Sequence, residues 1–122
     1  MPLLRPLDPA FPIERQIAMD ASPVVLVNVF TLAPADEETF LGAWQDDAVF
    51  MKQQPGFIST QLHRAIGDSP TYLNYAIWET NADFRAAFTH PTFRAKLSAY
   101  PASAVASPHL FKKVAVAGVC VA

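Results

Sequence analysis

The segment 24–32 (VVLVNVFTL) restricts the fold more than any other part of the chain. Its β-branched and apolar residues predict a strand. Residues at odd and at even positions of a strand point to opposite faces, and here both sets are apolar. Both faces of the strand should therefore be buried away from water. The chain is 52% hydrophobic and only 16% charged, which is more apolar than a small domain can hide by itself. We therefore expect a partner that covers part of this surface and an apolar cavity.

The remaining elements follow from turn residues, caps and apolar spacing. Pro34 opens a helix whose first turn is acidic, and a turn at 67–70 joins two neighbouring strands. Thr80 or Asn81 can cap the next helix, which meets Pro91. The predicted elements are a helix at 35–53, strands at 57–66 and 71–79, a helix that resumes after Pro91 as far as Tyr100, a linker at 101–107, and a last strand from Pro108 onward.

The element order predicts an α+β fold of the ferredoxin-like type. The order β-α-β-β-α-β gives one antiparallel sheet with two helices on one face. The other face is left bare, and strand parity places these apolar residues on it: Val25, Val27, Val29, Leu73, Tyr75 and Ile77. A two-fold copy of the same chain is the commonest cover for such a face, so we expect a homodimer.

The chain divides into two parts by composition. Residues 1–23 form a proline-rich arm, because five prolines deny it helical hydrogen bonds while its apolar residues require cover. We expect the arm to wrap over the domain or over its partner, with disorder as the alternative. Residues 24–122 form a single domain without internal repeats.

Composition and motifs exclude several classes of function. The net charge is −2, and no basic block is present, so nucleic acid is not an expected partner. No apolar run is long enough to span a bilayer, and the N-terminus is no secretory signal. Cys120 is the only cysteine, which fits a reducing, cytoplasmic location. No metal-ligand spacing and no glycine-rich phosphate loop occurs, so we expect neither a metal nor a nucleotide or flavin cofactor.

Strand parity brings Asn28 and Asn74 to the same face of the sheet. Asn28 shares its face with Leu26 and Phe30, and Asn74 shares its face with Trp78. This face looks toward the helices, so both amides should lie among apolar side chains. A buried amide without a hydrogen bond costs about 1–3 kcal/mol. Either neighbouring backbone groups satisfy the two amides, or the amides line a cavity and bind a ligand.

Aromatic residues and one histidine are further candidates for a pocket. The aromatic set has two interpretations, ordinary core packing and contact with a substrate. His90 precedes Pro91 at a helix break, where helix capping is the other interpretation. The candidate substrate contacts are Tyr72, Trp44, Phe84, Phe88, Phe93 and His90.

Four stretches, in this order, resemble one known family. They are PVVLVNVFTLAPADEETFLGAW, QQPGFISTQLHRAI, YLNYAIWETNADFRAAFTHPTFRA and PHLF, and together they span roughly residues 23–116. They are similar to the antibiotic biosynthesis monooxygenase family. The resemblance implies a dimeric α+β barrel, in which two ferredoxin-like sheets lie face to face.

The resemblance also implies two candidate reactions, oxygenation of an anthrone and degradation of haem. Asn74 and Trp78 resemble the Asn and Trp pair of anthrone oxygenases, which use neither metal nor flavin, whereas Phe84 replaces a tyrosine of that group. Asn28 and Trp78 resemble residues of haem-degrading members, but Leu97 stands where those enzymes have an axial histidine. Leucine cannot bind iron, which disfavours haem degradation.

These observations predict a cofactor-independent monooxygenase. It oxidises an aromatic or quinol-like small molecule with O2, and its catalytic residues are Asn28, Asn74 and Trp78. The alternatives are a non-catalytic homodimer that binds a small molecule and a haem-binding or haem-degrading relative.

Overall fold

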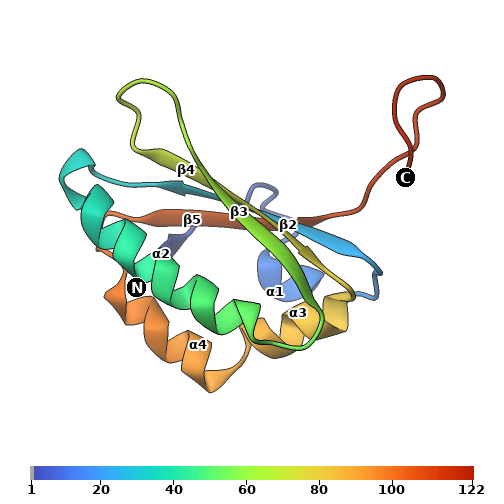
Figure 1. The fold of residues 1–122 in the computed structure, drawn as a ribbon, viewed down its shortest axis with the longest axis horizontal. Helices are drawn as coiled ribbons and strands as arrows, with labels where there is room; N and C mark the ends of the chain where they lie inside the picture. The colour runs from blue at the N-terminus through green and yellow to red at the C-terminus, as the bar shows by residue number, and fades with distance from the viewer. Residues whose placement is uncertain (1) are drawn as a thin grey trace.

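The chain forms an α+β fold in which one five-stranded sheet carries helices on one side (Figure 1). The computed structural model describes residues 2–122. The elements are β1 (Leu3–Leu4), α1 (Ile13–Gln16), β2 (Val24–Thr31), a 3₁₀ turn (Pro34–Asp36), α2 (Glu37–Lys52), β3 (Phe57–Arg64), β4 (Thr71–Trp78), α3 (Asn81–Phe88), α4 (Pro91–Lys96), a second 3₁₀ turn (Leu97–Ala99) and β5 (Val105–Phe111).

The sheet has the strand order β1-β5-β2-β4-β3. β2 is the middle strand and pairs antiparallel with both β4 and β5, while the short β1 pairs parallel with β5. The even positions of β2 face the helices, which accounts for the apolar residues of that parity, whereas Val27 and Val29 on the other face are only half-buried. The ferredoxin-like arrangement predicted from the element order is confirmed.

The helices α2, α3 and α4 lie on one side of the sheet (Figure 1). α3 begins where Thr80 caps it, since the Thr80 side chain accepts a hydrogen bond from the Asp83 amide at 3.0 Å. The helix expected to resume after Pro91 does so as α4, because proline is favoured in the first turn of a helix. On the opposite side of the sheet, Tyr75 and Phe111 are exposed and Val27 and Val29 are half-buried.

The predicted linker at 101–107 is wrong in its second half. β5 begins at Val105 rather than Pro108, and it ends at Phe111. Ala104, just before the strand, and Ala106 and Pro108 within it are small and buried, so alternation is present in this half of the strand but lacks large apolar residues. The residues that follow, 112–122, are exposed.

Pro108 sits inside β5 without breaking the sheet. The carbonyls of Ala104 and Ala106 accept hydrogen bonds from β1, so the even positions of β5 face that edge. β1 pairs only as far as Ala106, and the proline follows at the next position on the same edge. Further along, the amide of Leu110 donates to Gln16 Oε1 at 2.8 Å. A strand tolerates proline where no ladder hydrogen bond is required of it.

Residues 2–23 pack on the domain through α1. Ile13 and Ile17 belong to the same core as Val24 and Trp78. The side chain of Asn81 donates to the carbonyls of Gln16 and Met19 at 2.9 and 2.7 Å. These contacts tie α1 to the start of α3. Within residues 2–122, no helix combines the length and the apolarity needed to cross a membrane.

Gly56 allows the turn between α2 and β3 to approach α3 closely. Its φ is +82°, and a Cβ at this position would collide with the side chain of Asp83. We expect Gly56→Ala to lower the free energy of unfolding by about 2 kcal/mol or more, measured by urea denaturation. Gly67 has a φ of +69° with open space around it. Gly67→Ala should cost only about 1 kcal/mol, from backbone strain alone. Equal losses in the two variants would contradict this account.

Candidate active site

A cavity of about 110 Å³ lies between the sheet and the helices. The sheet provides Leu26, Asn28 and Phe30 from β2, Asn74, Ala76 and Trp78 from β4, and Ala106 and Pro108 from β5. The helices provide Trp44, Asp47, Ala48 and Met51 from α2, Phe84 and Phe88 from α3, and Phe93 from α4. The small residues of β5 help to leave this space open.

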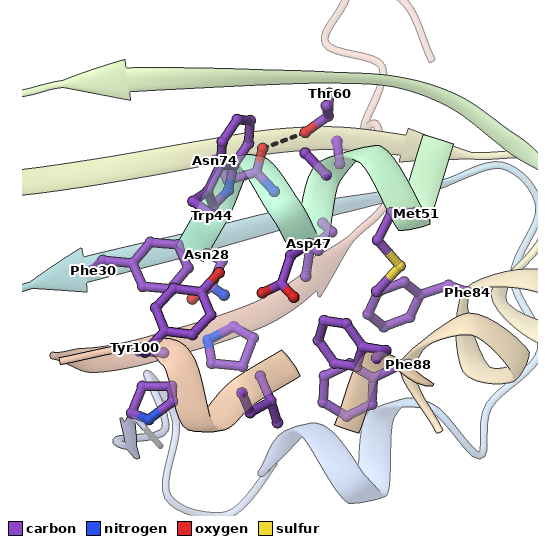
Figure 2. Close-up of a pocket in the computed structure, with 18 of the residues that line it drawn as sticks. Asn28, Phe30, Trp44, Asp47, Met51, Thr60, Asn74, Phe84, Phe88 and Tyr100 are labelled. Atoms are coloured by element: carbon purple, nitrogen blue, oxygen red, sulfur yellow. Dashed lines mark hydrogen bonds between the residues drawn. The ribbon is translucent and has the colours of Figure 1, made fainter. Parts of the chain in front are cut away.

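Asn28 and Asn74 are direct neighbours across β2 and β4. Thr60 Oγ1 donates to Asn74 Oδ1 at 2.5 Å, so the Asn74 amide nitrogen is left as a donor toward the cavity (Figure 2). Asn28 Oδ1 is buried and has no partner among the described residues. An unpaired buried polar atom costs about 1–3 kcal/mol. The site therefore carries an unmet hydrogen-bond requirement that a ligand can satisfy.

Trp78 forms part of the cavity wall, four residues along β4 from Asn74. Its side chain is 2% exposed, and its ring meets Phe57 and Phe84 edge to face at centroid distances of 5.4 and 5.7 Å. A chain of rings continues from Phe84 to Phe88 at 5.4 Å and from Phe88 to Phe93 at 5.7 Å. These rings keep water away from much of the wall, so polar groups in the cavity lie in a medium of low dielectric constant.

Two candidate substrate contacts lie outside the cavity lining. Tyr72 packs in a second core with Phe40, and its hydroxyl donates to Glu37 Oε1 at 2.7 Å. His90 is exposed and caps α4, because its Nδ1 accepts from the Thr92 amide at 3.0 Å. Capping, the other interpretation of His90, is the role that the structure shows. The other candidates do line the cavity: Asn28, Trp44, Asn74, Trp78, Phe84, Phe88 and Phe93.

The structure adds Asp47 and Tyr100 to the site. Asp47 is 6% exposed, and its Oδ1 has no partner among the described residues. Burial raises the pKa of Asp47 to about 6, with the nearby Tyr100 hydroxyl and the Lys96 charge opposing and Asp46 adding to the rise. Burial, and then the charge of Asp47, also raise the pKa of Tyr100. The position of Asp47 was readable, since it follows Trp44 by three residues on the apolar stripe of α2.

No histidine lines this cavity among residues 2–122, and Leu97, from the second 3₁₀ turn, does. An alkyl side chain cannot act as an axial ligand for haem iron. The described residues also contain no group of three or more His, Cys, Asp or Glu arranged to hold a metal ion. The polar side chains that line the cavity are the two amides, the Thr60 and Tyr100 hydroxyls, the indoles of Trp44 and Trp78, the Asp47 carboxyl and the exposed guanidinium of Arg94.

Comparison with known proteins finds a family model and two similar monooxygenases. Residues 23–97 match the family model described as antibiotic biosynthesis monooxygenase. Deoxynogalonate monooxygenase of Streptomyces nogalater is 32% identical over 93 residues, which are 76% of this chain and 78% of that protein. Tetracenomycin-F1 monooxygenase of Streptomyces glaucescens is 36% identical over 69 residues, which are 54% of this chain and 59% of that protein.

Solved structures show the same fold. SnoaB, a cofactor-independent oxygenase from Streptomyces nogalater, superposes with a TM-score of 0.66 at 32% identity, over 80% of this chain and 99% of that one. A conserved protein from Methanosarcina mazei superposes with a TM-score of 0.69 at only 8% identity, over 76% of this chain and 94% of that one. The second likeness concerns the fold alone.

Asp47 should make the stability of the fold depend on pH. Its pKa is higher in the folded chain (about 6) than its ordinary value of 3.8, so the folded protein holds this proton more tightly. Deprotonation therefore destabilises the fold as the pH rises from about 4 through about 6. We expect Asp47→Asn to be more stable than wild type at pH 8 by about 1–3 kcal/mol, and the gap to close at pH 4.

The measurement is urea denaturation at both pH values, with Asp46→Asn as the control. Asp46 is an exposed neighbour paired with Lys96 at 3.1 Å, and an exposed ion pair contributes little. A wild-type advantage over Asp47→Asn at pH 8 would show that the Asp47 carboxylate is stabilised rather than strained by its surroundings.

Proposed function

The chain belongs to the antibiotic biosynthesis monooxygenase family, and we propose that it is a cofactor-independent monooxygenase. Its substrate is an aromatic or quinol-like small molecule, and its second substrate is O2. The observation that supports this best is the pair of adjacent amides, Asn28 and Asn74, facing a cavity walled by aromatic rings. The 32% identity to a cofactor-independent oxygenase supports the same assignment.

The chemistry requires an electron-rich substrate. O2 must receive electrons, and in a reaction without a cofactor the substrate itself supplies them as a phenolate or enolate. The protein's task is to bind this anion and to hold oxygen beside it. N–H donors aimed at the developing oxyanion stabilise it, and they act more strongly where water is excluded.

Three residues divide this task. The Asn74 amide nitrogen is held toward the cavity by the Thr60 hydrogen bond, so it is oriented before the substrate arrives. Asn28 provides a second amide directly across the sheet. Trp78 forms the wall against which the aromatic substrate packs and provides an indole N–H as a further donor. For a substrate with an activated methylene, CH2 and O2 become C=O and H2O.

The working unit in this proposal is a homodimer. The sheet face opposite the helices exposes Tyr75 and Phe111 and leaves Val27 and Val29 half-buried. An apolar sheet face of this kind is commonly covered by a second copy of the chain. Face-to-face packing of two such sheets brings the bare face of each β2 into a buried interface.

The oxygenase proposal is tested by oxygen uptake with a panel of anthrones and hydroquinones. The purified protein, freed of metals by a chelator, should consume O2 faster than the uncatalysed reaction. Asn74→Ala should lower kcat by about 10²-fold, because it removes an oriented donor to the oxyanion. The control is Gln45→Ala, since Gln45 is an exposed amide on α2 outside the cavity lining. Full activity in Asn74→Ala would remove this residue from the mechanism.

The dimer is tested by light scattering after gel filtration. The expected mass is twice the chain mass of 13.3 kDa, and Tyr75→Asp should shift the protein toward the monomer by placing a charge in the interface. Phe11→Asp serves as a comparison, because Phe11 lies in the arm rather than on the sheet. A wild-type mass of a single chain would contradict the proposal.

A further inference from the structure

We propose that Asp47 is the acid–base residue of this cavity, which takes a proton from the substrate and returns it to the reduced oxygen. This inference rests on the proposed oxygenase function. It adds a catalytic residue that the two amides and the indole cannot replace, because none of those three groups accepts a proton readily near neutral pH.

The geometry of Asp47 is that of a functional rather than a structural carboxyl. Asp36 and Asp83 are engaged in structural hydrogen bonds: Asp36 accepts from the Ser103 hydroxyl at 2.6 Å, and Asp83 accepts from Thr80 at 2.9 Å. Asp47 is more than nine-tenths buried, and the Tyr100 hydroxyl favours its carboxylate, but its Oδ1 has no partner among the described residues. Figure 2 shows its carboxyl group projecting from α2 into the space between Asn28 and Phe88.

Asp47 carries the only carboxyl group among the described residues that line the cavity. The other ionisable lining groups are Arg94 and Tyr100. An arginine stays protonated and cannot serve as a base. Burial raises the pKa of Tyr100, so its hydroxyl keeps its proton near neutral pH. Asp47 is therefore the one lining group that can exchange a proton in the range where an enzyme works.

The groups around Asp47 come from each element packed against it. α2 itself contributes the negative charge of Asp46, and α4 contributes the positive charges of Arg94 and Lys96. The chain after the second 3₁₀ turn contributes the Tyr100 hydroxyl, whereas the sheet contributes the uncharged amides. Burial outweighs the Tyr100 hydrogen bond and the attraction of Lys96, so the carboxyl has a pKa of about 6 and is mostly ionised at neutral pH.

For a substrate with an activated methylene, Asp47 carries both C–H protons to the reduced oxygen. The Asp47 carboxylate removes one C–H proton, the carbanion transfers its electrons to O2, and a C–O bond forms to give a peroxide. Asp47 returns its proton to the distal oxygen. It then takes the second C–H proton while the O–O bond breaks, and the leaving hydroxide receives that proton as water. The carbon is oxidised to a carbonyl, and O2 is reduced.

The first step can be measured without oxygen. Under anaerobic conditions in D2O, the wild-type protein should accelerate exchange of the methylene protons of a hydroxylated anthrone, followed by NMR. The exchange rate should rise with pH through an inflection near pH 6 and then level off, because the base form of Asp47 is required. Asp47→Asn should exchange about 10²-fold more slowly and lose this inflection. Asp47→Glu should recover part of the rate.

Asp46→Asn is the matched control. It removes the neighbouring carboxyl on the same helix, which is exposed and does not line the cavity. Its exchange rate on the plateau should stay within about twofold of wild type, and the inflection should persist at a slightly lower pH, because Asp46 adds only the smallest contribution to the raised pKa of Asp47. Unfolding of each variant is excluded by urea denaturation at the assay pH.

The outcomes separate this inference from the oxygenase proposal. Exchange that depends on Asp47 without oxygen uptake supports the acid–base role and contradicts the oxygenase. Oxygen uptake with an unaltered rate and pH profile in Asp47→Asn overturns the acid–base role and leaves the oxygenase standing. The absence of enzyme-accelerated exchange in wild type likewise overturns the role of Asp47.

Discussion

The apolar character of both faces of β2 is the constraint on which the rest of the structure depends. This strand lies in the middle of the sheet, and its valines, leucine and phenylalanine alternate between the two sides of that sheet. The helices α2, α3 and α4 cover one side (Figure 1). The helical side holds the cavity, and the other side is the surface that a second copy can cover. One apolar strand thus separates a candidate catalytic face from a candidate assembly face.

The cavity combines dry walls with polar groups that the protein leaves unpaired. Asn28 Oδ1 and Asp47 Oδ1 are both buried without partners, although each unpaired atom costs free energy. A fold selected for stability alone would pair such atoms or replace them with apolar groups. Strain of this kind is common at functional sites, where groups are held ready for a ligand. The hydrogen bond from Thr60 shows that the protein does fix the amide whose direction matters.

Most helices and strands of the fold can be predicted from the sequence because the residues that define them act locally. The β-branched runs, the helix start at Pro34, the Thr80 cap and the turn at 67–70 each act over a few residues. The start of β5 was missed because its buried positions are Ala and Pro, whose small side chains weaken the alternation. The reason for those small residues is the cavity, which is a tertiary feature and leaves no mark in local propensity.

The same limit applies to the site. Strand parity was enough to bring Asn28 and Asn74 together, since residues of one parity share a face. Strand parity cannot predict that the Tyr72 hydroxyl donates a hydrogen bond to Glu37 in a second core. That contact depends on where the helix α2 crosses the sheet. Asp47 lies on the apolar stripe of α2, and a carboxyl in such a stripe is the sequence signal that indicates a buried acid. Its missing partner could only be seen in three dimensions.

Isotope labelling tests the central claim most directly. The purified, metal-free protein is supplied with a hydroxylated anthrone and ¹⁸O2, and the product and the water are analysed by mass spectrometry. The account predicts that one labelled atom enters the new carbonyl group, that the other appears in water, and that no hydrogen peroxide accumulates. Unlabelled product, or release of the consumed oxygen as hydrogen peroxide, would contradict it, because oxygen would then only be reduced and not inserted.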